Sequence, residues 1–197
     1  MLQQYSYVRF HHVLLFPIVK SMSLTFSNVV ETRWIRQQAY SYCQLPSSNS
    51  SSITILSRKG VRRQLLNENE IAESLENRGY RVIVRNFGNQ SYCDQVHAMQ
   101  LSRGVISNHG AQLTNLLFLQ PGSFVIEIFN SLFYLDIYEG LARQAEVQYV
   151  AFRNATIVNM PGEKVRQFWY HPYVHCDVVA DPLSIVHLVE SFLFRAC

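Results

Sequence analysis

Residues 104–129 place the strongest constraint on what this chain can fold into. They begin with a short apolar strand at 105–106, which runs into a polar turn at 107–110. A helix is expected over 111–118 and a second apolar strand over 124–128. Such a strand–helix–strand unit predicts parallel strands, and ligands of open α/β sheets bind at the carboxyl ends of those strands. The polar turn is therefore the first candidate site.

Strands recur every 20 to 30 residues in the rest of the chain. Apolar and β-branched runs at 53–56, 81–84 and 147–150 predict three more strands, with helical segments between them. This alternation is typical of βαβ units in a parallel sheet. Because crossovers in such sheets are right-handed, the predicted fold class is α/β, a Rossmann-like parallel sheet with flanking helices.

Capping residues mark several helix boundaries. Asn67 with Glu70, and Ser91 with Asp94, have the spacing of a capping box, so helices are expected to begin after Asn67 and Ser91. Gly79 is expected to end the first of them as a C′ glycine. The remaining expectations are helices over 29–43 and 132–143, an irregular segment over 153–174, and a last helix that begins at 181–182.

Length and composition suit one domain with an appendage. The 197 residues are 48% hydrophobic and 16% charged, which allows a packed core. Residues 46–52 are polar and turn-forming, so we predict a linker there. Residues 1–45 are then a remnant of an N-terminal domain or a linking segment, and residues 53–197 form the α/β domain.

Several function classes are disfavoured. A net charge of +3 with one short basic cluster at 58–63 is too little for a nucleic-acid partner, but enough to hold one diphosphate. No segment reaches the roughly 18–20 apolar residues of a membrane span, so membrane contact is expected only through a targeting segment that this sequence does not show. The sequence has no D-x-D motif and no C-x-x-C spacing, so no metal and no other cofactor is expected.

The sequons and the cysteines bear on the cellular compartment in which the protein folds. N-x-S/T sequons at Asn49, Asn89 and Asn154 are predicted glycosylation sites and favour the secretory pathway. In an oxidising lumen the four cysteines could pair in three ways, and the sequence does not choose among them. Buried thiols are the expected state of at least two of these cysteines, Cys43, Cys93, Cys176 and Cys197.

The basic cluster follows the strand at 53–56. Arg58 comes first, with Lys59, Arg62 and Arg63 close behind. A guanidinium at a strand end can hold a diphosphate through paired, charge-assisted hydrogen bonds. A solvated basic loop explains the charges equally well.

The turn after the central strand carries the other candidates. His109 could donate to a phosphate or leaving group, or act as a base; a turn histidine that caps the helix is the alternative. The backbone N–H groups of Gly110 and Ala111 suit a phosphate at a helix start. Thr114 and Asn115, in the first turn of that helix, could complete the site or serve as ordinary helix-start residues.

Glu127 is a single charge within the apolar run 124–128. A buried unpaired carboxylate is costly, so Glu127 is expected to face a ligand, to face an arginine, or to lie at a wet strand edge. A ribose diol would suit it as a ligand. Gln95 could reach the same crevice, although a surface amide is the simpler interpretation.

In order and spacing, these residues resemble the C-terminal half of glycosyltransferase family 61. The resemblance rests on Ser57-Arg58, the Arg-x-x-x-Asn-Glu block at 63–68, Gln95-Val96, the H-G-A-x-L-T-N segment at 109–115 and Val-Ile-Glu-Ile at 125–128. It covers residues 53 to about 152.

The resemblance implies a nucleotide-sugar-binding domain like the C-terminal domain of a GT-B enzyme. It further implies an inverting, metal-independent transfer of a sugar from a UDP-sugar to a hydroxyl of a glycoprotein or glycan. In animal members the sugar is N-acetylglucosamine, and the reaction takes place in the lumen of the endoplasmic reticulum or Golgi. Carried over to this chain, the diphosphate and base pocket is lined by Arg58, Arg63, His109, Gly110, Ala111, Thr114 and Asn115, with Glu127 on the ribose.

Family members have a whole N-terminal domain before the linker, which in GT-B enzymes usually supplies the acceptor groove and catalytic base. A truncated, non-catalytic nucleotide-sugar-binding remnant is therefore the alternative. A dehydrogenase-type Rossmann domain is disfavoured, because the sequence has no G-x-G-x-x-G motif.

Overall fold

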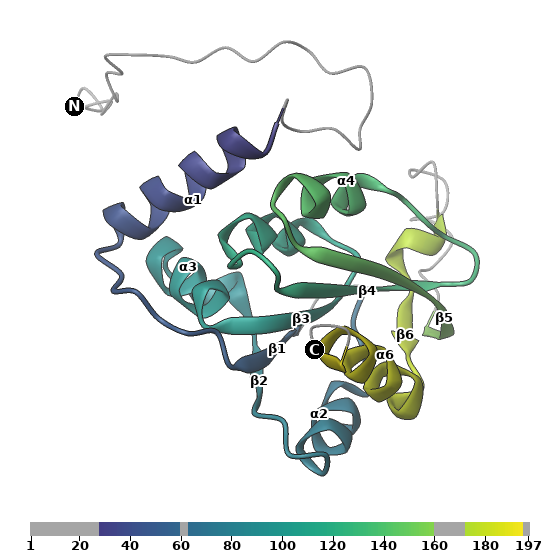
Figure 1. Ribbon diagram of the computed structural model, residues 1–197. Coiled ribbons are helices and arrows are strands. Elements are labelled where there is room, and N and C mark those ends of the chain that lie inside the picture. Colours follow the sequence, from purple (N-terminus) through teal and green to yellow (C-terminus); the bar gives the residue numbers. More distant parts are fainter. Residues whose placement is uncertain (1–27, 60–62, 160–171, 195–197) are drawn as a thin grey trace, which may run out of the picture.

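The computed structural model describes residues 28–59, 63–159 and 172–194 (Figure 1). Expectations that concern residues 1–27, Arg62 and Cys197 lie outside these ranges. The described strands form a six-stranded sheet in the order β2-β1-β3-β4-β5-β6, with helices on both faces. The predicted Rossmann-like α/β fold is confirmed.

The strands of the sheet match the predicted ones in number and order as far as β5. Strands β1 to β5 pair in parallel, and β6 is antiparallel to β5. The order 2-1-3-4-5 has its topological switch point between β1 and β3, where ligands of such sheets bind. The bounds are β1 (Ser52–Leu56), β2 (Val82–Arg85), β3 (Ser102–Asn108), β4 (Phe124–Asn130), β5 (Gln148–Asn159) and β6 (Asp177–Val179).

The prediction of an irregular segment from residue 153 was wrong, because β5 continues to Asn159. The first part of β5 pairs with β4, and its last part pairs with β6 through Thr156↔Val179 and Ile157↔Val178. This second partner lies about twenty residues further along the chain, beyond the local pattern on which the prediction rested.

The helices also follow the prediction, with two differences. Residues 111–118 are helical, but the helix is of the 3-10 type. Helix α4 begins at Ile137 instead of residue 132, because Leu132 and Phe133 donate backbone N–H groups to Asn130 and form a turn. The bounds are α1 (Val29–Tyr42), α2 (Glu68–Glu76), η1 (Phe87–Asn89), α3 (Tyr92–Gln100), η2 (Ala111–Phe118), α4 (Ile137–Gln144), η3 (Pro172–His175) and α6 (Pro182–Phe194). No described helix is long and apolar enough to cross a membrane.

Two of the three predicted capping features are confirmed. Ser91 and Asp94 form the capping box of α3. Gly79 has a φ of 84° and closes α2 with the paired bonds of a Schellman motif. Asn67 precedes α2 but makes no capping bond. Its buried amide instead accepts from the backbone N–H of Ala180 at 3.1 Å and donates to the carbonyl of Ala180 at 2.7 Å, which ties α2 to the segment before α6.

The hydrophobic core lies on both faces of the sheet. Val105 and Val125 point to the face covered by α1, α3, η2 and α4. Ile106 and Ile126 point to the face covered by α2 and α6. Because the central strands are buried on both sides, they are continuous apolar runs in the sequence.

Helix α1 is docked on this domain. The buried guanidinium of Arg36 donates to the carbonyls of Leu117 at 3.0 Å and Ala145 at 2.6 Å. A disulfide between Cys43 and Cys93 joins the end of α1 to the start of α3. Cys176 is buried outside the disulfide. The origin of residues 1–45 in an N-terminal domain stays a prediction.

Candidate functional site

The carboxyl ends of β1 and β3 bring two arginines together over one glycine. Arg58 follows β1 and Gly110 follows β3. A Cβ atom on Gly110 would overlap Nη1 of Arg58, and would lie 3.3 Å from Cζ of Arg58 and 4.0 Å from Nη1 of Arg63. The absence of a side chain at Gly110 therefore leaves the space that the guanidinium groups occupy, at the switch point of the sheet.

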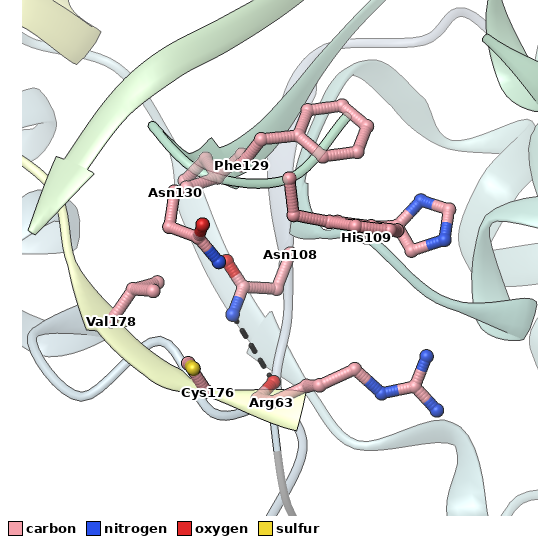
Figure 2. Close-up of a pocket in the computed structure, with 9 residues that line it drawn as sticks. Arg63, Asn108, His109, Phe129, Asn130, Cys176 and Val178 are labelled. Carbon is pink, nitrogen blue, oxygen red and sulfur yellow. Dashed lines mark hydrogen bonds between the residues drawn. The ribbon is translucent and has the colours of Figure 1, made fainter. Parts of the chain in front are cut away.

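The backbone around Arg63 is fixed by β6 and β3. Leu66 donates to the carbonyl of Val178 at 2.9 Å, and Val178 donates to that of Gln64 at 2.9 Å. The Asn108 side chain at the end of β3 donates to the carbonyl of Arg63 at 3.2 Å (Figure 2). Arg63 has a φ of 66°, in the left-handed region that non-glycine residues seldom adopt. The structure maintains this strained conformation directly beside the candidate site.

Both guanidinium groups lack a counterion among the described residues. Burial lowers the pKa of Arg58 and of Arg63, and the charge of Arg58 lowers the pKa of Arg63 further. Within the described ranges, Nη1 of Arg58 and Nε of Arg63 are buried without a hydrogen-bond partner. Two partly desolvated cations held side by side are costly unless an anion joins them. The geometry thus differs from that of a solvated basic loop, whereas Lys59 is exposed.

A cavity of about 510 Å³ opens beside Arg58. Its wall includes the turn 86–89, which follows β2, and the side chains of Gln95 and Asn115. The Asn115 amide donates to Oε1 of Gln95 at 3.1 Å, so Gln95 lies in the wall instead of on the open surface. A cavity of this size is large enough for a drug-sized ligand.

Glu127 lies beneath His109. Its side chain is completely buried, and Oε1 lies 2.6 Å from Nδ1 of His109. The hydroxyl of Tyr149, on the neighbouring strand β5, donates to Oε2 at 2.6 Å. None of the three surroundings considered for Glu127 matches, since its neighbours are a histidine and a tyrosine. With both oxygens bonded and none exposed, a contact to ribose is not available to Glu127 in this arrangement.

Aromatic rings hold His109 in place. Its ring stacks on the ring of Phe129, with the two ring centroids 5.2 Å apart. The ring centroids of Phe133 and Tyr138 lie 5.3 and 5.7 Å from that of His109. Figure 2 shows His109 and Arg63 among the residues that line a small pocket at the ends of β3 and β4. Burial raises the pKa of the Glu127 carboxyl, although its bonds to His109 and Tyr149 partly offset this. Burial also raises the pKa of Tyr149 and of Tyr138, and the charge of Glu127 adds to both shifts.

The two predicted site residues within η2, Thr114 and Asn115, differ in their surroundings. Asn115 lies in the cavity wall, whereas the exposed Thr114 donates its hydroxyl to the carbonyl of Ala111 at 2.7 Å, as an ordinary helix-start residue does. Ala111 lines the cavity next to Gly110. The predicted residues therefore form one group about Arg58 and a second, adjoining group about His109.

Tyr138, Tyr149 and the turn 86–89 were not predicted as site residues. Tyr149 had no local signal, because its position beside Glu127 depends on the pairing of β4 with β5, in which Val125 lies opposite Tyr149. Tyr138 had none either, because its orientation depends on where α4 begins.

The sequon residues Asn49, Asn89 and Asn154 are all exposed, and their glycosylation stays a prediction. In the described part of the chain, no group of three potential metal ligands comes together.

Comparison with known proteins identifies relatives of this chain. Residues 6–126 match the profile of the family described as Glycosyltransferase 61. The EGF domain-specific O-linked N-acetylglucosamine transferase of Drosophila melanogaster is 32% identical over 152 residues, which are 74% of this chain and 28% of that protein. The Bos taurus protein of the same name is 31% identical over 114 residues, 55% of this chain and 21% of that protein. Protein O-linked-mannose beta-1,4-N-acetylglucosaminyltransferase 2 of Tetraodon nigroviridis is 31% identical over 108 residues, 52% of this chain and 18% of that protein.

The matched part of the chain thus spans less than a third of the length of each of these relatives.

Proposed function

The chain belongs to the glycosyltransferase 61 family, and from this premise we propose that it binds the diphosphate of a UDP-sugar between Arg58 and Arg63. The observation that carries the proposal is the pair of half-buried guanidinium groups over Gly110, with buried N–H donors that have no partner among the described residues. A diphosphate would supply both the missing acceptors and the missing negative charge. The cavity beside Arg58 would then receive the nucleoside.

The proposed reaction is an inverting transfer of the sugar, N-acetylglucosamine, to a hydroxyl group of a glycoprotein or glycan. The names of the relatives support this choice of sugar. In the reaction the bond from the sugar to the β-phosphate breaks, and negative charge develops on the diphosphate. We propose that Arg58 and Arg63 stabilise that charge, so that no metal ion is needed. His109 is the proposed catalytic residue.

We further propose that the protein works in the lumen of the secretory pathway, the endoplasmic reticulum or Golgi. The disulfide between Cys43 and Cys93 supports an oxidising compartment. The exposed sequon residues Asn49, Asn89 and Asn154 are compatible with it. For the whole protein we propose a GT-B architecture, in which the α/β domain of this chain is the C-terminal, nucleotide-sugar-binding one.

The second candidate function is binding without transfer. The arginine pair over Gly110 and the cavity beside Arg58 would serve ligand binding whether or not transfer follows. Release of N-acetylglucosamine from the donor, or its transfer to a glycoprotein acceptor, would separate the two functions. Donor binding without turnover would favour the second.

Calorimetric titration of UDP into wild type, Arg58→Ala and Arg63→Ala tests the shared step. A hydrogen bond to a charged group contributes about 1.5–3 kcal/mol, so each substitution should weaken binding by about tenfold or more. Arg78→Ala is the matched control, because Arg78 is far more exposed and pairs with Glu190 at 3.0 Å on the α2–α6 side of the sheet. Wild-type affinity in both site variants would refute the assignment.

A further inference from the structure

Glu127 and Tyr149 do not line the proposed ligand site. They form a buried, hydrogen-bonded group beneath His109. Glu127 is buried in the middle of the sheet, where an ionised carboxylate is costly. Its two oxygens are each 2.6 Å from one partner, Nδ1 of His109 and the hydroxyl of Tyr149. A leucine in this position would fill the space without that cost, so the carboxylate calls for a chemical explanation.

We propose that Glu127 and Tyr149 are positioning residues that hold His109 as its Nδ1–H tautomer, with Nε2 as the proton acceptor. The inference rests on the proposed function and assigns the direction of proton transfer within it. An ionised carboxylate can only accept hydrogen bonds, so the proton between Glu127 and His109 belongs to Nδ1. In the neutral ring, Nε2 then carries the lone pair.

Tyr149 completes the arrangement. Its raised pKa keeps the phenol protonated, so that it donates to Oε2. Without this bond Oε2 would be buried without a partner, and the carboxyl would be protonated more easily. A protonated Glu127 could donate to Nδ1 and reverse the tautomer. Tyr149 therefore supports the ionised state of Glu127 that the tautomer requires.

The rings around His109 fix the direction of its second nitrogen. Phe129 lies parallel to the imidazole within 28°, and Phe133 and Tyr138 contact it at steeper angles. No described residue bonds to Nε2 of His109. His109 and Arg63 line the same small pocket (Figure 2), so the His109 ring lies beside the proposed diphosphate site.

The proton and electron balance of the step follows from this placement. The acceptor hydroxyl gives its proton to Nε2 while its oxygen forms a bond to C1 of the sugar. The bond from C1 to the phosphate oxygen breaks, and its electron pair leaves with the diphosphate toward Arg58 and Arg63. The imidazolium that forms is stabilised by the carboxylate of Glu127.

The tautomer can be measured directly by ¹⁵N NMR of protein labelled at histidine. The chain has 7 histidines, and the His109→Asn spectrum identifies the signals of interest. In wild type at neutral pH, His109 should be protonated at Nδ1 and bare at Nε2. In Glu127→Gln the ratio of the two tautomers should change by at least about tenfold, the size of one lost hydrogen bond to a charged group.

Tyr149→Phe should change the ratio in the same direction, by a smaller amount. Tyr134→Phe is the matched control, because its hydroxyl bonds to Glu139 at 2.9 Å and not to Glu127. A wild-type ring protonated at Nε2, or an unchanged ratio in the site variants, would overturn the inference. If Glu127→Gln does not fold, Tyr149→Phe decides alone.

Titration with UDP separates this inference from the proposed function. Glu127→Gln should bind UDP within about twofold of wild type, because the diphosphate is held by the two arginines. If wild type does not bind UDP, the proposed function fails, while the tautomer measurement still decides the role of Glu127 and Tyr149.

Discussion

Replacing Gly110 with alanine tests the arginine pair without removing any charge. The new Cβ would lie 3.3 Å from Cζ of Arg58 and overlap its Nη1. Ordinary contact between such atoms needs about 3.5–4.0 Å, so the guanidinium of Arg58 must retreat by about 1 Å or more. The φ of Gly110 is 164°, an extended conformation that alanine adopts, and the displaced group is the end of a flexible side chain. The fold should therefore be retained.

The expected cost falls on binding. A guanidinium displaced by this distance loses at least one charge-assisted hydrogen bond to the diphosphate, which is worth about 1.5–3 kcal/mol. At about 1.4 kcal/mol per tenfold, Gly110→Ala should weaken UDP binding by about 10- to 100-fold. Calorimetric titration gives the affinity, and thermal unfolding verifies that the melting temperature changes by only a few degrees.

A double-mutant cycle with Arg58→Ala separates displacement of Arg58 from other causes. When Arg58 is absent, the methyl group of alanine has little to displace. Gly110→Ala should then cost less than about 0.5 kcal/mol in the Arg58→Ala background, so the two losses should be clearly non-additive. Wild-type affinity in Gly110→Ala, or additive losses in the double variant, would show that Gly110 does not act by leaving room for Arg58.

Three further predictions concern stability. Reduction of Cys43–Cys93, or Cys43→Ser with Cys93→Ser, should lower the free energy of unfolding by about 4 kcal/mol in the chain-entropy account, because the bridge closes 50 residues; denaturant unfolding with and without reductant measures it, and an unchanged midpoint would count against the bridge. Gly104→Ala should cost about 1–3 kcal/mol or more, since its Cβ would overlap the ring of Phe124, which stacks on Phe192 at 4.9 Å; a melting temperature equal to that of wild type would contradict this packing. Glu127 has a folded-state pKa above its usual value, so its carboxyl binds a proton more tightly in the folded protein. The contribution of Glu127 to stability should therefore be fully present below the unfolded pKa of about 4.3 and fall as pH rises through the raised folded pKa. Glu127→Gln should abolish that part of the pH dependence of the free energy of unfolding, and parallel curves for the two proteins would show that the shift is absent.

The sequence was sufficient for the central strands β3 and β4, because they are buried on both faces of the sheet. Apolar runs such as 105–106 and 124–128 become β3 and β4, and the local capping box of Ser91 and Asp94 begins α3 as expected. The errors concern groups whose partners lie far away in the chain. Asn67 bonds to Ala180, 113 residues away, instead of capping α2, and the end of β5 depends on β6.

The candidate site shows the same limit. The positions of Arg58, His109 and Gly110 at strand ends follow from the order of elements. The convergence of Arg63 on Arg58 depends on a left-handed backbone held by β6, which no local pattern indicates. The surroundings of Glu127 depend on Tyr149, which belongs to a different strand. Sequence therefore predicted the position of the candidate site, and the contacts within it required the fold.

Diphosphate binding at Arg58 and Arg63 is tested most directly by calorimetric titration of the wild-type chain with UDP and with uridine, each with and without EDTA. We expect that UDP binds at one site, that EDTA leaves the affinity for UDP unchanged, and that uridine binds at least about tenfold more weakly because the diphosphate contacts are lost. Equal affinity for UDP and uridine, loss of binding in EDTA, or no binding by the folded chain would contradict a diphosphate site at Arg58 and Arg63.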